Sequence, residues 1–277
     1  MDFFGAFHQQ ESGLLHGQAG FLFELPADDG LEQIRQKLDE ALFYLGMIQP
    51  LPAPIFTPLA DQNWMEAWKE RYKPIPIGKT LIIVPAWLES PEAERISIKI
   101  DPGMAFGTGT HPTTQLCLEL IETAFNEPVK ANCPPLNVID VGCGSGILSI
   151  GALKIGAVFA LGVDIDEASV KASRENADAN GIAPERFAIG LGSVTEIRDG
   201  KFLIRQAPLV LANILAPVII RLFGMGLAEL VAPGGVLILS GILAEQAGSV
   251  QSAAKEQGLR FAKQRRLGDW VALTFER

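Results

Sequence analysis

The sequence predicts a doubly wound α/β fold, in which helices cover both faces of a mainly parallel sheet. Strands and helices alternate from residue 137 onward, and a glycine-rich turn joins the first strand of this series to its helix. Seven strands are expected, over residues 138–141, 158–163, 187–190, 209–212, 236–240, 260–264 and 270–275. The last two are expected to close the sheet as an antiparallel pair. A single ligand site is expected beyond the carboxyl ends of the strands.

Residues 137–166 form the central unit, with the sequence NVIDVGCGSGILSIGALKIGAVFALGVDID. Its opening apolar run is short and is stopped by glycine, which predicts a buried parallel strand. Gly142, Gly144 and Gly146 allow a sharp turn and a close approach of the backbone to a ligand. The helix that follows directs its unpaired N–H groups toward the same point. Asp164 ends the second strand, where an acid commonly binds the two hydroxyls of a ribose.

The spacing of the glycines separates two classes of ligand. A dinucleotide fingerprint requires G-x-G-x-x-G, but here the third glycine comes one residue early and Ile147 follows it. The pattern D-x-G-x-G-x-G, which begins at Asp140, is similar to the S-adenosylmethionine turn of doubly wound methyltransferases. A glycine turn alone is also found as a plain tight connection. Together with both strands, the helix and Asp164, it predicts a cofactor site.

Composition indicates a globular protein of the cytoplasm. The chain has 277 residues, of which 48% are apolar and 20% charged, and no apolar run approaches the ~20 residues of a membrane span. The N-terminus has no basic region before its apolar residues, so a secretory signal is not expected. Three cysteines without C-x-x-C spacing and three scattered histidines indicate neither disulfides nor a metal site.

The charge is acidic and unevenly distributed. A net charge of −9 argues against direct nucleic-acid binding. Residues 1–58 carry eight acids and two bases, a net −6, which leaves −3 for the rest of the chain. Such a segment could attract a basic protein partner, although a solvated helix face explains the same charges.

Three segments are expected in the domain organisation. Residues 1–58 predict a small α+β domain for substrate recognition, with a capping box at Asp29 before an amphipathic helix. A linker helix is predicted over residues 59–73, and its two tryptophans are expected to pack on a neighbouring domain. Residues 74–277 predict the catalytic domain, with entry strands over 79–87 and 95–100.

The loop DPGMAFGTGTHPTT, residues 101–114, is the second informative motif. It precedes a helix predicted from Pro112 to Phe125, and it can place Phe106, Thr108 and Thr110 over a ligand. Alone, it could equally be a capped turn. His111 is open to two interpretations, a catalytic base or, more in keeping with its place before proline at a helix start, a local cap.

Later elements place two further polar residues at strand ends. Ser193 follows the third strand, and Asn213 lies at the carboxyl end of the fourth. Helices are expected over 166–180, 217–231 and 244–257, with Asp166 as the cap of the first and residues 233–235 as a turn after the second.

Three motifs together resemble the PrmA-type methyltransferases, a family that modifies ribosomal protein eleven of the large subunit. They are the loop at 101–114, the glycine unit from VIDVGCGSG to GVDID, and ANILA followed by GGVLILSGIL. The resemblance extends roughly from Asp61 to the C-terminus. Many family members begin with a longer recognition domain than this chain has.

The resemblance implies S-adenosylmethionine as cofactor and methyl transfer to lysine side chains and an N-terminal amine. It places Phe106, Thr108 and Thr110 in the loop that covers the cofactor. It assigns the methionine and ribose parts to the glycine turn and its flanking acids, the adenine to the loop after the third strand, and the transferred methyl group to the last residue of the fourth strand. These cofactor contacts are Asp140, Gly142, Gly144, Gly146, Asp164, Ser193 and Asn213.

The leading hypothesis is therefore a protein N-methyltransferase, a monomer acting on a basic ribosomal protein, with Asn213 as its catalytic residue. The Asn213 carbonyl can accept an N–H from the amine and aim its lone pair at the methyl group. A small-molecule N-methyltransferase would share the whole cofactor site. An NAD-dependent oxidoreductase is disfavoured by Ile147, and a noncatalytic binding module would not need Asn213.

Overall fold

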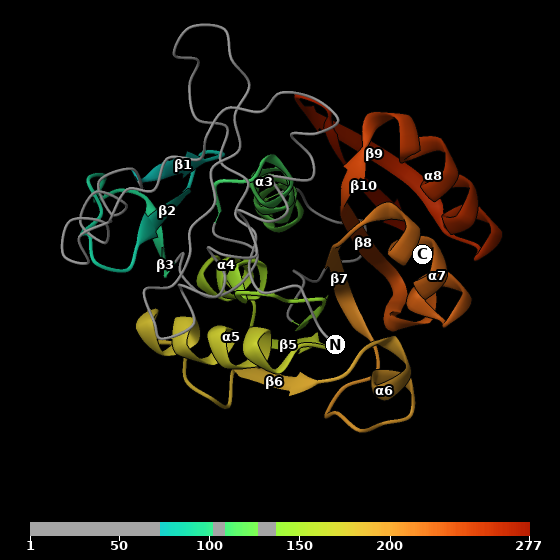
Figure 1. The fold of residues 1–277 in the computed structure, drawn as a ribbon, viewed down its shortest axis with the longest axis horizontal. Helices are drawn as coiled ribbons and strands as arrows, with labels where there is room; N and C mark the ends of the chain where they lie inside the picture. The colour runs from blue at the N-terminus through green and yellow to red at the C-terminus, as the bar shows by residue number, and fades with distance from the viewer. Residues whose placement is uncertain (1–72, 102–108, 127–136) are drawn as a thin grey trace, which may run out of the picture. The chain divides into compact units, whose positions relative to one another are not determined.

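The structure is a computed structural model that describes residues 73–101, 109–126 and 137–277 (Figure 1). The chain divides into two compact units, Met1–Trp64 and Met65–Arg277, and every described residue lies in the second. The predicted α+β domain at 1–58, the predicted linker helix up to residue 72, Phe106 and Thr108 lie outside the described residues. These assignments stay predictions.

Seven strands form one mixed sheet in the described part of the chain. They are β4 (Asn137–Val141), β5 (Phe159–Asp164), β6 (Phe187–Leu191), β7 (Ala207–Asn213), β8 (Val231–Leu243), β9 (Arg260–Leu267) and β10 (Trp270–Glu276). Their spatial order is β6-β5-β4-β7-β8-β10-β9. The first five are parallel, whereas β10 runs antiparallel to both β8 and β9. All seven predicted strands and the closing antiparallel pair are confirmed.

The strand order reverses between β4 and β7. From β4 the chain proceeds outward to β5 and β6, then returns to place β7 on the other side of β4. In doubly wound folds a ligand binds at such a reversal, beyond the carboxyl ends of the two neighbouring strands.

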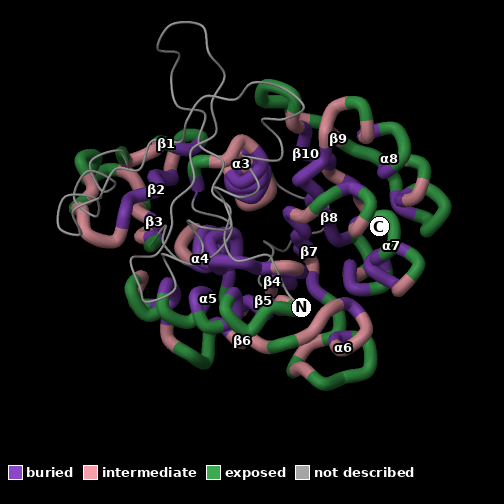
Figure 2. The backbone as a smooth tube through the Cα atoms, in the orientation of Figure 1, coloured by how far each residue is buried: buried purple, intermediate pink, exposed green. Residues whose placement is uncertain are grey.

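Helices cover both faces of the large sheet, as the alternating pattern predicts (Figure 1). One face carries α3 (Pro112–Asn126), α4 (Ile147–Lys154) and α5 (Glu167–Ala179). The other carries α6 (Val194–Arg198), α7 (Ala216–Gly224) and α8 (Ala247–Glu256), with two short 3₁₀ segments, η1 (Leu227–Leu230) and η2 (Ala244–Gln246). Each face buries its own apolar core against the sheet, and Figure 2 shows that much of the central strands is buried. No helix within the described ranges combines the length and the apolar character needed to cross a membrane.

Local sequence explains where these helices begin and end. Asp166 is the N-cap of α5, and its carboxylate accepts the backbone N–H groups of Ala168 and Ser169 at 3.1 and 3.2 Å. Gly181 follows the helix with a φ of 67°, in the left-handed region that ends a helix most easily at glycine. Pro112 is the first residue of α3, as expected for a residue without an N–H.

A second, three-stranded sheet packs on α3, α4 and α5. Its strands are β1 (Ile75–Ile77), β2 (Leu81–Pro85) and β3 (Ile96–Ile100), with β1 antiparallel and β3 parallel to β2. Its apolar side chains belong to the same core as those of α3 and α4. Strands β2 and β3 were predicted, but β1 was not. Pro76, at the centre of β1, fits there because β1 lies at the edge of this sheet.

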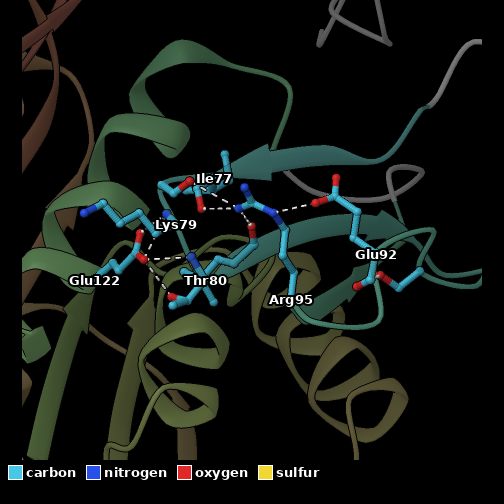
Figure 3. Close-up of polar contacts among 9 residues, drawn as sticks. Ile77, Lys79, Thr80, Glu92, Arg95 and Glu122 are labelled. Atoms are coloured by element: carbon cyan, nitrogen blue, oxygen red, sulfur yellow. Dashed lines mark hydrogen bonds and ion pairs between the residues drawn. The ribbon is translucent and has the colours of Figure 1, made fainter.

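The turn between β1 and β2 is held from two sides, as Figure 3 shows. The buried carboxylate of Glu122 accepts the backbone N–H groups of Lys79 and Thr80 and the Thr80 hydroxyl, at 2.7 to 3.0 Å. On the other side, Arg95 donates to the carbonyl oxygens of Ile77, Gly78 and Leu81 at 3.0 to 3.3 Å. This turn therefore ties the small sheet to α3.

Two predicted features after β7 are corrected. The helix expected over 217–231 ends at Gly224, and the turn expected at 233–235 lies within β8. Val231 already pairs with Ala207 on β7, and the strand then bulges before the regular register resumes. The bulge is closed from the C-terminus, because the backbone of Arg277 exchanges hydrogen bonds with Gly234 and Gly235 at 3.0 and 3.1 Å.

Candidate active site

The candidate site lies beyond the carboxyl ends of β4 and β7, at the reversal of strand order. Asp140 on β4 pairs with Leu211 on β7, so Asn213 ends its strand two residues beyond that pair. The glycine turn leaves β4 at the same edge. The structure therefore brings the predicted glycine turn, Asp140 and Asn213 together.

All three glycines of the turn have left-handed backbones. Their φ angles are 74° at Gly142, 54° at Gly144 and 77° at Gly146, a region in which a Cβ is strained. At Gly142 a Cβ would also come within 2.7 Å of the Ile214 side chain, next to Asn213. Only glycine can therefore join β4 to α4 along this path, and the resulting turn lies close to the end of β7.

Asp164 connects the ends of three loops. Its Oδ2 accepts the N–H of Gly144 at 2.9 Å, and its Oδ1 accepts the N–H of Asp166 at 3.1 Å. Its backbone carbonyl accepts the N–H of Gly192 at 2.8 Å, in the loop after β6. A carboxylate has about four acceptor positions, so two engaged oxygens retain capacity for ribose hydroxyls.

Two side chains of helix α5 donate hydrogen bonds to the glycine turn. Sequence reasoning did not predict this contact. Ser173 donates its hydroxyl to the carbonyl of Gly144 at 2.8 Å, and Asn176 donates from its side-chain amide to the carbonyl of Ser145 at 2.9 Å. Both side chains are buried. Two small polar residues on an otherwise amphipathic helix, three positions apart, were the only local signal for this role.

Asp140 is buried inside the fold. Its Oδ2 accepts the hydroxyl of Ser149 on α4 at 2.9 Å, while its Oδ1 has no hydrogen-bond partner among the described residues. Burial is the main cause that raises the pKa of Asp140 to about 7, and the nearby Asp164 carboxylate raises it further. Asp140 therefore anchors α4 and leaves one carboxyl oxygen for a donor supplied by a ligand or water.

Asn213 is held by α3. Its side-chain Nδ2 donates to the hydroxyl of Thr114 at 3.3 Å. The residue is 8% exposed, and its Oδ1 has no partner in the part of the chain that the structure describes. A buried amide oxygen without a partner is costly unless a ligand supplies a donor. Thr114 lies in the predicted loop motif, but sequence reasoning did not assign it a role.

Three further residues singled out in the sequence, Ser193, Thr110 and His111, lie at the ends of helices or in the loops before them. Ser193 precedes α6, a short helix that was not predicted, and donates its N–H to the Glu196 carboxylate at 3.0 Å. Thr110 is exposed, and its carbonyl accepts from Gln115 at 3.0 Å. His111 accepts the N–H of Thr113 at Nδ1, at 3.3 Å, so the interpretation of His111 as a local cap is confirmed.

These features fit S-adenosylmethionine. The glycine turn brings the backbone close to the reversal point, and Asp164 retains acceptor capacity for hydroxyls. One side-chain oxygen each of Asp140 and Asn213 has no partner among the described residues and can accept a hydrogen bond from a ligand. The comparison with known families decides the matter, because the model of the PrmA family, described as ribosomal protein L11 methyltransferase, matches residues 26–277.

The chain belongs to the PrmA family.

Individual relatives agree with the family match. The chain is 39% identical to a ribosomal protein L11 methyltransferase of Parasynechococcus marenigrum, over 92% of this chain and 87% of the relative. A relative in Herpetosiphon aurantiacus is 40% identical, with 90% and 80% covered. Among solved structures, a ribosomal protein L11 methylase from Lactobacillus delbrueckii subsp. bulgaricus has a TM-score of 0.63 at 35% identity, covering 74% of this chain and 99% of that one.

Membership of the PrmA family confirms the predicted enzyme class and cofactor. The protein is an S-adenosylmethionine-dependent protein methyltransferase, of a family that acts on a ribosomal protein. The predicted Rossmann-like sheet is confirmed by the strand order and by the solved relative.

Proposed function

We propose that this protein transfers methyl groups from S-adenosylmethionine to lysine side chains and to the N-terminal amine of ribosomal protein L11. The observation that carries the proposal is the buried Oδ1 of Asn213, which has no partner among the described residues and lies at the edge where the cofactor turn ends. The family match over residues 26–277 supports the substrate.

The residues that would hold the cofactor surround the reversal point. The glycine turn and Asp140 would contact its methionine part, Asp164 its ribose, and the loop at Ser193 its adenine. Phe106, Thr108 and Thr110 would cover it. When bound, the cofactor supplies a methyl group made electrophilic by the sulfonium, so no covalent enzyme intermediate is required.

Asn213 would orient the acceptor amine. Its Oδ1 can accept one N–H and thereby aim the nitrogen lone pair, while the bond from Nδ2 to Thr114 fixes the direction of the amide. Orientation is only part of the task, because a lysine with a pKa near 10.4 costs about 4 to 5 kcal/mol to deprotonate at neutral pH. A terminal amine near 7.7 to 8 costs about 1 kcal/mol. An amide is too weak a base to take this proton.

We further propose a cytoplasmic monomer that recognises a basic ribosomal protein. The net charge of −9 supports a basic partner, because complementary charge steers association. Ribosomal proteins are synthesised in the cytoplasm, which is where such a substrate is available.

Intact-mass spectrometry of purified ribosomal protein L11, incubated with the protein and S-adenosylmethionine, tests the proposal. We expect mass increments of whole methyl groups, with peptide mapping placing them on lysine and N-terminal amines. Absence of increments from a protein that still binds the cofactor would contradict the substrate and favour a small-molecule amine acceptor. A panel of free amines assayed in parallel would then identify that class.

A further inference from the structure

The N-terminal end of α3 lies beside the side chain of Asn213. Thr114, in the first turn of this 15-residue helix, receives the hydrogen bond from Asn213 Nδ2. Aligned peptide dipoles give a helix of this length about half a positive charge at its N-terminus. The partial positive charge therefore lies at the end of the site where the acceptor amine would be held.

This helix end keeps its positive character because its cap is neutral. His111 accepts the N–H of Thr113 at Nδ1, at 3.3 Å, and its backbone carbonyl accepts the N–H groups of Thr114 and Gln115 at 3.1 and 3.4 Å. The first turn contains no acidic residue. Helices are more often capped by Asp, Asn, Ser or Thr, and an Asp here would place a full negative charge near Asn213.

His111 is also partly enclosed. Its ring contacts the ring of Trp270 edge-on, with 4.8 Å between centroids, and burial lowers the pKa of the imidazole below its usual value. The Nδ1 atom also lies 2.7 Å from the hydroxyl oxygen of Thr113. A neutral ring with an unprotonated Nδ1 can accept both the Thr113 hydroxyl and its backbone N–H, so the neutral ring fits this cap. The helix end thus carries no compensating charge on its cap.

A second, independent feature indicates that a donor binds at this helix end. The Oδ1 of Asn213 is buried without a partner among the described residues, and its residue is 92% buried, from an exposed fraction of 8%. An amine N–H is the donor that the family's reaction brings to this edge. The first-turn N–H groups are already bonded, so the helix end acts on that amine through its electrostatic field rather than by direct contact.

The other titratable groups near this helix end, in the described ranges, are one thiol, two carboxyls on the sheet and one exposed ion pair, and the two carboxyls oppose its field when they are ionised. On α3, burial raises the pKa of Cys117 above its usual range, so that thiol stays uncharged. On β4, Asp140 has a pKa raised to about 7. On β5, both oxygens of Asp164 accept backbone N–H groups. Before β10, Asp269 lies 3.9 Å from Arg266 in an exposed ion pair. Strands β7 and β8 contribute only the neutral Asn213 and Ser240 at this level.

We infer that the N-terminal end of α3, with His111 as its neutral cap, disfavours the ammonium form of the acceptor amine beside Asn213. The inference rests on the proposed function, since it concerns an amine acceptor. Its consequence is that the helix contributes to deprotonation of lysine, which the Asn213 amide, a very weak base, does not accomplish. His111 is a positioning residue in this account, because it acts through the helix.

The test compares His111→Asp with His111→Asn. Both replacements are good N-caps, so both preserve α3, but only Asp adds a negative charge. The readout is the pH dependence of kcat/KM for methylation of ribosomal protein L11, measured by mass spectrometry at saturating S-adenosylmethionine. We expect His111→Asp to move the midpoint upward by about half to one pH unit, a loss of about three- to tenfold on the acidic side. The rates should converge with wild type at high pH. His111→Asn should keep the wild-type midpoint, whatever its maximal rate.

A second variant keeps the inference testable if His111→Asp does not fold. Gln115→Glu adds a carboxylate of the same shape to the first turn, and it should shift the midpoint in the same direction as His111→Asp. Equal midpoints for wild type, His111→Asp and Gln115→Glu would overturn the inference. A wild-type protein that methylates no amine of L11 would instead refute the proposed function, so the two failures are distinguishable.

Discussion

Asn213 on β7 donates from its side-chain Nδ2 to the hydroxyl of Thr114 on α3, at 3.3 Å. The two residues are 99 positions apart in the chain, and both are buried. Because Nδ2 is engaged, the other end of the amide, Oδ1, is the atom left for a ligand. The bond therefore connects the loop motif at 101–114 with the motif ANILA in a single site.

Thr114→Val should reduce turnover about tenfold, because loss of a hydrogen bond worth about 1.4 kcal/mol frees the Asn213 amide to rotate. Thr114→Ser keeps the hydroxyl and should restore most of the rate. Steady-state kinetics with both variants check this. If serine is as slow as valine, the hydroxyl does not orient Asn213.

Asp164→Ala should weaken S-adenosylmethionine binding by about 10- to 100-fold, the equivalent of about 1.5 to 3 kcal/mol for hydrogen bonds to a charged group. It removes the acceptor proposed for ribose and also the partner of the Gly144 N–H. Isothermal titration calorimetry measures the loss. Asp166→Ala is the matched control, since it removes only the cap of α5 and should cost about 1 kcal/mol of stability with little change in affinity. Unaltered binding by Asp164→Ala would remove Asp164 from the ribose site.

Gly142→Ala should abolish most activity, whereas Gly181→Ala should not. Both glycines have a positive φ, of 74° and 67°, so both substitutions add backbone strain of about 1 kcal/mol. Only at Gly142 would the new Cβ come within 2.7 Å of Ile214, while nothing lies within 4 Å at Gly181. Thermal unfolding of both variants measures the loss of stability caused by backbone strain. Their turnover then shows whether the Cβ at Gly142 also displaces the site. Equal activities would argue that the Ile214 contact is unimportant.

Asp140→Asn should become more stable relative to wild type as pH rises. The folded-state pKa of Asp140 is raised by burial from 3.8 to about 7, so its contribution to wild-type stability is full below about pH 4 and is lost as pH rises toward 7. Asparagine does not ionise, so the variant does not lose stability at this position as pH rises. The difference in unfolding free energy should change by up to about 4 kcal/mol across that window and level off above it. Urea titrations across the window measure it, and a pH-independent difference would contradict the buried carboxyl assignment.

Local sequence was sufficient for most of the catalytic fold. The glycine turn, the cap at Asp166 and the start of α3 at Pro112 each depend on residues within one turn of chain, and each was predicted. The acid at the end of β5 and the amide at the end of β7 were also placed correctly at one sheet edge, because parallel strands in a doubly wound fold share that edge.

Contacts between distant segments were not predictable in the same way. The bulge in β8 depends on Arg277, more than forty positions later, so Pro233 and the glycines beside it suggested a turn instead. Strand β1 is stabilised by its pairing with β2 and by the Glu122 carboxylate on α3, despite its proline. The support that Ser173 gives the glycine turn likewise requires α5 to fold back across β4 and β5.

The most direct test of the central claim, that Asn213 aims the acceptor amine, is a paired measurement on Asn213→Ala. Single-turnover methylation of ribosomal protein L11 gives the rate of transfer, and calorimetry gives the affinity for S-adenosylmethionine. We predict a rate reduced by about 100-fold, since loss of a hydrogen bond made at the reacting atom costs about 2.7 kcal/mol, with an affinity within about threefold of wild type. Equal losses of rate and affinity would contradict the claim, because they would make Asn213 a cofactor-binding residue rather than the group that orients the amine.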